Sequence, residues 1–227
     1  ASLNSGDTET LLLPTGTPFD DISHLLYLPP NLRSGDQRSG VEIDIVASDA
    51  VTVSEGSTLS TEVGGSLSLR SNNGTGVVAG TLYAPAGQIS ISAGLNSRSG
   101  TGDEEFIEEG SALIIEGSAR LLTPGISYIT SKELNSEGTE LVNGEIFDGG
   151  EVKLVSETLL IEDGAIIDVS GTSTVFDLPV SDGAGGIARL PVELESDGGQ
   201  VYIATRNFDF EGASFNAAGG GASSNGG

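Results

Sequence analysis

Residues 149–171 read GGEVKLVSETLLIEDGAIIDVSG, and residues 198–220 repeat nearly the same phrase as GGQVYIATRNFDFEGASFNAAGG. In both stretches apolar residues alternate with polar ones, the alternation stops at an acid–Gly step, and it then resumes. Alternation at period two points Val152 and Leu154 to the same face of a strand. Glycine can adopt a positive φ and so lets the chain turn sharply. The return of the whole phrase predicts a stack of similar coils, each built from three short strands.

Two shorter phrases recur along the rest of the chain. The first places Gly before an alternating pair of apolar residues, as GSLSL (65–69), GQISI (87–91), GEVKL (150–154) and GQVYI (199–203), and VEIDI (41–45) matches it without the Gly. We expect these five segments to stack in parallel on one sheet, about 4.8 Å apart. The second is an acid–Gly phrase, found as EGSTL (55–59), EGSAL (109–113), EGTEL (137–141), DGAII (163–167) and EGASF (211–215). A further copy, EGSAR (116–120), carries Arg120 in the apolar position.

The spacing of these phrases predicts an all-β parallel β-helix of about 20 to 25 residues per coil with almost no α-helix. A β-sandwich remains an alternative, because short alternating strands with frequent turn signals suit it too. The recurrence of whole phrases, corners included, favours the coils. The inward-facing residues that we expect to be buried are Val152, Leu154, Ile161, Ile167, Val201, Ile203, Phe210 and Phe215.

The repeats do not fill the chain evenly. Residues 1–39 lack both phrases and contain four prolines, so we expect an irregular leader or cap there. Residues 40–227 carry the repeats, with insertions at about 95–108, 126–148 and 172–197. The second insertion could hold one more coil around Glu137-Gly138. Insertions in a solenoid leave at its corners and often carry specific function.

Composition excludes several classes of partner. The chain has 227 residues, with 9 Lys and Arg against 33 Asp and Glu, a net charge of −24. Like charges repel, so we expect no nucleic-acid partner and no anionic membrane surface. Cysteine is absent, which excludes disulfides and thiol chemistry. No signal peptide and no apolar run of membrane-spanning length is visible, so we expect no membrane insertion and read the chain as a mature protein or an excerpt.

Candidate chemistry is sparse. The single His, His24, has apolar neighbours and is expected to be structural, and no GxSxG motif is present, so we expect no enzyme and no catalytic residues. The densest charge cluster is DEEFIEE at 103–109. Hard oxygen ligands suit calcium, which makes Asp103, Glu105 and Glu108 candidate calcium ligands. The simpler interpretation is a solvated loop, because the spacing of an EF-hand is missing. No other cofactor is expected.

The repeated sequence phrase is similar to the repeats of filamentous-haemagglutinin-type exoproteins, the large secreted partners of bacterial two-partner secretion systems. The Gly pair, V-x-L, the EDGA corner and the IDVSG closure carry the resemblance, over about 40–94, 109–125, 149–171 and 198–220. The resemblance implies a right-handed parallel β-helix that is exported through an outer-membrane transporter. It also implies a secreted or cell-surface location and no functional residues that could be carried over.

The expected function is therefore a rigid scaffold segment of a surface adhesin. Such a segment would support adhesion or biofilm formation by binding a host-cell, bacterial or polysaccharide surface. The alternative is a carbohydrate-binding or carbohydrate-degrading β-helix protein. Aromatic residues are only 5% of this chain, which favours the scaffold, because a sugar-binding groove needs clustered rings.

Overall fold

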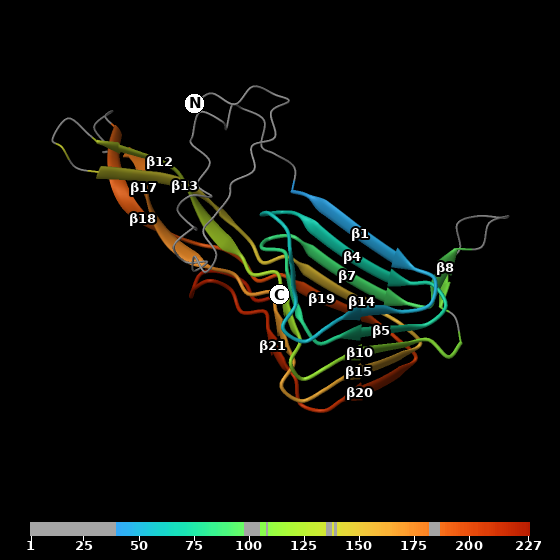
Figure 1. The fold of residues 1–227 in the computed structure, drawn as a ribbon. Coiled ribbons are helices and arrows are strands. Elements are labelled where there is room, and N and C mark those ends of the chain that lie inside the picture. The colour runs from blue at the N-terminus through green and yellow to red at the C-terminus, as the bar shows by residue number, and fades with distance from the viewer. Residues whose placement is uncertain (1–39, 98–104, 108, 135–137, 139, 182–186) are drawn as a thin grey trace, which may run out of the picture. The chain divides into compact units, whose positions relative to one another are not determined.

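A computed structural model describes residues 40–97, 105–107, 109–134, 138, 140–181 and 187–227 (Figure 1). The expected leader at 1–39, with His24, lies outside the described residues. Regular structure in the described part is entirely β, with no helix. It follows that this part has no helix long and apolar enough to cross a membrane.

The first parallel sheet contains the five segments that share the Gly-led phrase. Its strands, in spatial order, are β1 (Glu42–Ala47), β4 (Ser66–Ser71), β7 (Gln88–Ala93), β14 (Glu151–Val155) and β19 (Gln200–Ala204). Every neighbouring pair is parallel. The prediction that these segments form one stacked parallel sheet is confirmed, and two antiparallel sheets packed face to face are excluded.

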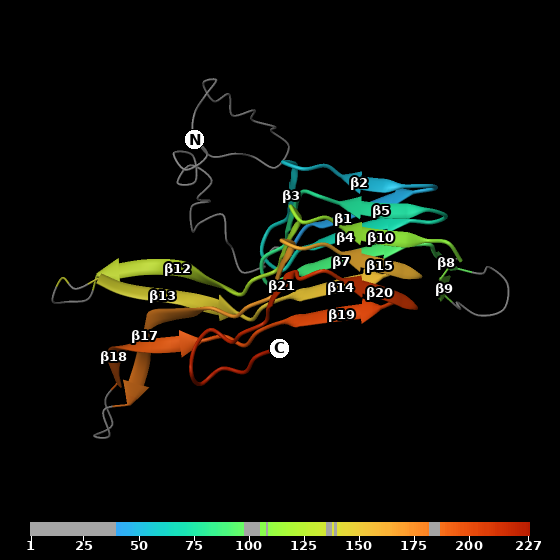
Figure 2. The same ribbon diagram turned by 90° about the horizontal axis from the view of Figure 1, so that it is seen from below.

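Two further five-stranded parallel sheets complete the stack (Figure 2). The second contains β2 (Val51–Val53), β5 (Thr75–Val78), β10 (Ala112–Ile115), β15 (Thr158–Ile161) and β20 (Asn207–Phe210). The third contains β3 (Thr58–Ser60), β6 (Thr81–Tyr83), β11 (Arg120–Leu122), β16 (Ile166–Asp168) and β21 (Ser214–Asn216).

We call one strand from each sheet, in chain order, a coil. The described residues form five coils stacked in register, an arrangement compatible with a parallel β-helix. Paired positions of the first three coils, Glu42, Ser66 and Gln88, are 24 and 22 residues apart. This spacing lies within the period that the sequence predicts.

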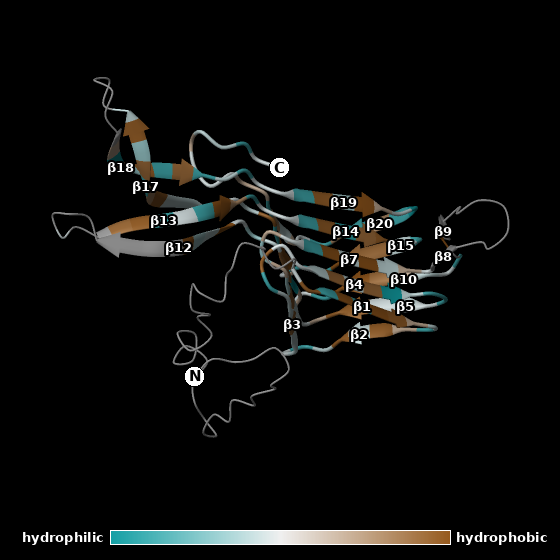
Figure 3. Cartoon of the chain, turned by 90° about the horizontal axis from the view of Figure 1, so that it is seen from above, coloured by the Kyte–Doolittle hydropathy of each residue, from teal (hydrophilic) through white to brown (hydrophobic). Residues whose placement is uncertain are grey.

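The core lies between the three sheets and consists of in-register ladders of apolar side chains. In the third sheet Leu82, Leu121 and Ile167 stack on one another, each with none of its surface exposed. The first sheet is aligned in the same way: Figure 3 shows the hydrophobic parts of its strands β7, β14 and β19 side by side. Four of the residues predicted to be buried are fully buried: Val152, Leu154, Ile161 and Ile167.

The fifth coil departs from the predicted burial. Phe210 and Phe215 were expected in the core, but 45% and 41% of their surfaces are exposed. Val201 and Ile203 are half-buried and pack against the core from one side. The cause is position, because these residues face inward but belong to the last coil of the described stack. Burial in a solenoid needs a neighbouring coil on both sides.

The acid–Gly phrase does not mark one repeated corner. Asp163-Gly164 leads into the third sheet, with φ of Gly164 at +89°, whereas Glu109-Gly110 leads into the second. The interpretation of Arg120 as an apolar position is also wrong. Arg120 faces outward and the inward place in β11 belongs to Leu121, because the turn before this strand is offset by one residue.

Three antiparallel hairpins interrupt the coils: β8–β9 (Leu95–Ser97, Glu105–Ile107), β12–β13 (Ile126–Leu134, Glu140–Phe147) and β17–β18 (Ser173–Ser181, Ile187–Glu195). The coil suggested around Glu137-Gly138 is therefore wrong. The segment pairs with itself from Ile126↔Phe147 to Leu134↔Glu140, so its strands do not join the stack. Glu137 itself lies outside the described residues.

The second and third hairpins leave the stack at the same corner. β12–β13 lies between β11 and β14, and β17–β18 lies between β16 and β19, so each connects the third sheet of one coil to the first sheet of the next. Figures 1 and 2 show both hairpins projecting to one side of the stack, with β8–β9 on the opposite side.

Candidate functional site

The predicted calcium ligands are not brought together by anything that the structure describes. Asp103 and Glu108 lie outside the described residues. Glu105 is described only in its backbone, which pairs with Ser97 in the hairpin β8–β9. Elsewhere in the described part, no group of three or more His, Asp or Glu side chains is placed to hold a metal ion. The calcium site stays a prediction, which calorimetry with Ca²⁺ on an Asp103→Asn, Glu105→Gln variant would test.

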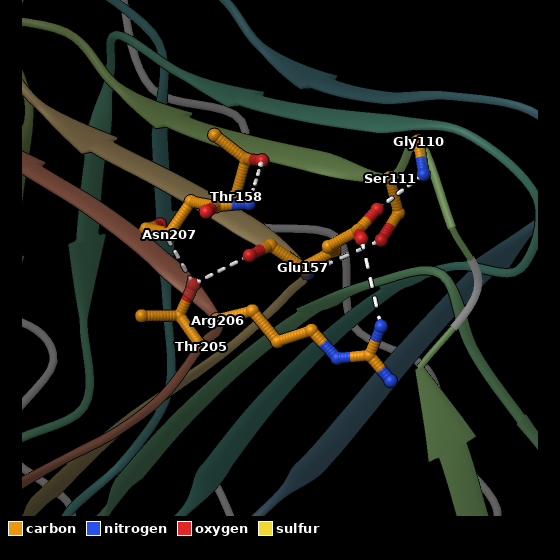
Figure 4. A network of polar contacts seen from close by, with 7 residues as sticks. All are labelled: Gly110, Ser111, Glu157, Thr158, Thr205, Arg206 and Asn207. Carbon is orange, nitrogen blue, oxygen red and sulfur yellow. Dashed lines mark hydrogen bonds and ion pairs between the residues drawn. The ribbon is translucent and has the colours of Figure 1, made fainter.

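A network of polar contacts surrounds Glu157, at the corner between β14 and β15 (Figure 4). One carboxylate oxygen, Oε2, accepts a hydrogen bond from the backbone N–H of Gly110. The other, Oε1, lies 3.7 Å from a guanidinium nitrogen of Arg206. The backbone N–H of Glu157 donates to Ser111 Oγ at 3.2 Å. Glu157 therefore links the coil before it to the coil after it.

The carbonyl oxygen of Glu157 extends this network into the fifth coil. It accepts from the backbone N–H groups of Arg206 and Asn207 at 3.0 and 2.9 Å, and from Thr205 Oγ1 at 2.9 Å. A corner leaves backbone groups outside the sheet ladders, and unpaired buried groups of this kind are costly. The Glu157 network satisfies these groups.

The polar groups of this corner join neighbouring coils. Only 17% of the Glu157 side chain is exposed, and its partners are backbone amides, hydroxyls and one guanidinium. The Arg206 side chain is 63% exposed, so its ion pair is solvent-screened and contributes little to stability. Through these contacts the network connects three consecutive coils.

The two hairpins at the shared corner pack together, and we name β12–β13 and β17–β18 the hairpin arm. Asp177 Oδ2 accepts from the backbone N–H of Val142 at 2.7 Å, which ties the second hairpin to the first. Arg189 donates to Asn143 Oδ1 and, at 3.2 Å, to the carbonyl oxygen of Asp177. These contacts fix the two hairpins against each other.

The hairpin arm has a small core of its own. The ring of Phe176 is 1% exposed, and it lies so close to Gly144 that a Cβ there would be 2.3 Å from the ring. Gly144 therefore allows a close approach that any larger residue would prevent. Interlocked packing of this kind gives the arm a defined shape.

The hairpin arm carries three exposed apolar side chains that do not share one face. Ile129, Val175 and Leu190 are 41%, 53% and 48% exposed. Ile129 pairs with Gly144, and Leu190 pairs with Leu178 on the face that also carries Phe176, so both lie on the faces that meet at the Gly144–Phe176 contact. Val175 lies on the opposite face of β17–β18. Because binding residues are often carried by insertions on a regular scaffold, the arm is the candidate recognition site of the described chain.

Sequence reasoning missed both features. For the corner, a signal was present, because SET at 156–158 and TRN at 205–207 occupy equivalent places between strands. For the arm, the insertions at 126–148 and 172–197 were visible, but their mutual packing was not. The contacts that join them connect residues 35 to 46 positions apart, which no local pattern encodes.

Comparison with known proteins adds no identification: no protein-family model, no curated protein and no solved structure matches this chain.

Proposed function

We propose that this chain is a segment of a large secreted bacterial surface adhesin, in which a right-handed parallel β-helix acts as a rigid scaffold for the hairpin arm. The observation that carries the proposal is the attachment of two interlocked hairpins to one corner of a five-coil stack. A stack with continuous apolar ladders resists bending, and the arm stands out from its side. This is a geometry suited to display.

The hairpin arm supplies the binding surface under this proposal. Its exposed side chains, Leu190 among them, would contact a host-cell, bacterial or polysaccharide surface. The net charge of −24 keeps the scaffold soluble and disfavours non-specific attachment to anionic surfaces. Export would proceed through an outer-membrane two-partner secretion transporter, as the sequence resemblance implies.

A binding experiment with a matched control tests the proposal. The purified chain would be applied to host cells, bacteria and immobilised polysaccharide, together with the variants Leu190→Asp and Val46→Asp. Leu190 lies on the arm and Val46 on β1, and both are 48% exposed, so the two changes add the same charge at equal exposure. A 1.4 kcal/mol loss of binding free energy corresponds to a tenfold weaker affinity.

We expect the parent chain to bind at least one of the three surfaces. Leu190→Asp should weaken that binding about tenfold or more, and Val46→Asp should leave it unchanged. Circular dichroism would show that both variants keep the parent fold. Equal losses in the two variants, or a folded parent that binds none of the surfaces, would reject the arm as the recognition site. Hydrolysis of the polysaccharide would favour the carbohydrate-active alternative.

A further inference from the structure

The end of the stack at the fifth coil, which we name the C-terminal face, presents aromatic residues in interior positions. Phe208, Phe210 and Phe215 are 52%, 45% and 41% exposed. Their in-register partners in the fourth coil are Leu159, Ile161 and Ile167, all with none of their surface exposed. The three rings lie together, with centroids 6.2 Å apart for Phe208–Phe210 and 5.5 Å apart for Phe210–Phe215. The face therefore consists of core side chains that no coil covers.

The backbone of this face is open as well. Strands β19, β20 and β21 are each the last strand of their sheet in the described chain. The outer N–H and C=O groups of an edge strand can pair with another strand, and natural proteins normally block or cover such edges. The inward positions of β20 and β21 hold Phe208, Phe210 and Phe215 instead of charged residues, and aromatic side chains favour further strand pairing.

A third observation fixes where a covering strand would start. Two first-sheet strands, β14 and β19, follow the triplets Asp148-Gly149-Gly150 and Asp197-Gly198-Gly199, and a third triplet of this kind is Asn225-Gly226-Gly227. The triplets stack in the same way. Asp197 N–H donates to Asp148 Oδ1 at 2.8 Å, and Asn225 N–H donates to Asp197 Oδ1 at 2.7 Å.

The glycines of the three triplets repeat the same hydrogen bonds. Gly149 N–H donates to the carbonyl oxygen of Asp197 at 2.9 Å, and Gly198 N–H donates to that of Asn225 at 2.9 Å. The N–H of the second glycine in each triplet donates to the carbonyl oxygen of the residue that directly follows the preceding third-sheet strand. These bonds are Gly150 to Thr123 at 2.7 Å, Gly199 to Val169 at 2.6 Å and Gly227 to Ala217 at 2.8 Å. Gly226-Gly227 thus occupies the place from which a first-sheet strand starts.

From these observations we infer that the C-terminal face receives a sixth coil of the same solenoid, entered from Gly227. This coil adds one parallel strand to each of β19, β20 and β21 and lays apolar side chains over Phe208, Phe210 and Phe215. A second copy of the chain fits the face less well. Residues 225–227 already cover the place next to Gly198-Gly199 from which a new first-sheet strand would start. A strand that is not continuous with Gly227 would therefore have to displace them.

An added coil tests this inference, which does not depend on adhesion. Residues 151–171, the part of the fourth coil that follows Gly149-Gly150, would be copied directly after Gly227. In the control extension, the copies of five of the fully buried core residues are replaced by Ser; these residues are Val152, Leu154, Leu159, Ile161 and Ile167. Melting temperature, binding of a hydrophobic dye and molar mass by light scattering would be compared with those of the parent chain.

We expect the added coil to raise the melting temperature by about 5 °C or more and to reduce dye binding, with the protein monomeric. The control extension should do neither. A melting temperature at or below that of the parent, or equal gains from both extensions, would overturn the inference. So would a parent chain that already self-associates through this face, shown by a dimer that Phe210→Asp converts to monomer.

Discussion

Exchanging Ile167 for Asp should unfold the stack, whereas the same exchange at the neighbouring Ile166 should not. Ile167 has none of its surface exposed and lies between Leu121 and Phe215 in the third-sheet ladder. Ile166 faces outward on the same strand and lies between Arg120 and Ser214. The two changes add the same charge one residue apart, so they differ only in the face that they affect.

The magnitude follows from burial. Removing a fully buried Ile side chain costs about 2 to 5 kcal/mol of unfolding free energy. An unpaired buried carboxylate adds a desolvation penalty on the order of several kcal/mol. The sum for Ile167→Asp is about 5 kcal/mol or more, comparable to the whole stability of a typical domain. Ile166→Asp places its charge beside the Arg120 guanidinium and should change stability by about 1 kcal/mol or less.

Urea unfolding followed by circular dichroism measures both variants. Ile167→Asp should be largely unfolded without urea, or should have a much lower midpoint, while Ile166→Asp should follow the parent curve closely. The milder Ile167→Val should cost about 0.5 to 1.5 kcal/mol and keeps the test informative if the Asp variant cannot be purified. Equal destabilisation at Ile166 and Ile167 would refute the register of β16, because a shift by one residue exchanges the two faces.

Three other predictions concern a corner, the C-terminal triplet and the hairpin arm. Gly164 has φ of +89°, so Gly164→Val should cost about 1 to 2 kcal/mol and Gly164→Asn clearly less, as urea midpoints would show; equal costs would mean that φ is not the cause. Hydrogen bonds from Asn225 hold the pKa of Asp197 below its ordinary value of 3.8. These bonds therefore stabilise the fold fully above pH 3.8, and their contribution is lost as the pH falls through the lower pKa of the folded state. The amide signal of Asn225 in NMR should therefore titrate with a midpoint below 3.8, a titration that Asp197→Asn abolishes, and a higher midpoint would contradict the contact. Asp177→Ala removes the acceptor of the Val142 N–H. A lost hydrogen bond of about 1 kcal/mol allows local opening, so hydrogen exchange at Val142 should accelerate about fivefold or more while core amides keep their rates. Unchanged exchange at Val142 would show that other contacts hold the two hairpins together.

The first sheet was predictable because its signal is local. A Gly before an alternating pair of apolar residues specifies a turn and the inward face of a strand within five residues, and GSLSL, GQISI, GEVKL and GQVYI all lie where that pattern places them. The corners were less predictable. A positive φ is needed at several different turns, so an acid–Gly step marks a turn without saying which sheet follows it.

Burial and the candidate site depend on distant parts of the chain. Phe210 and Phe215 have the same inward orientation as Ile161 and Ile167, and only the presence of a neighbouring coil makes one pair buried and the other exposed. The hairpin arm depends on contacts between two separate insertions, such as that of Asp177 with Val142. Alternation along one strand carries no information about such contacts.

The central claim is that the first-sheet strands stack in parallel and in register, and spin-label distances test it most directly. The chain has no Cys, so labels attach only at introduced cysteines. Glu42 and Gln200 begin the outer strands β1 and β19, and Val46 and Ala204 lie in register further along the same strands. Four strand spacings separate each pair, so both the Glu42–Gln200 and the Val46–Ala204 distances should be about 19 Å. The crossed pair Glu42–Ala204 should be longer. A crossed distance shorter than the two in-register distances would mean antiparallel strands and would contradict the account.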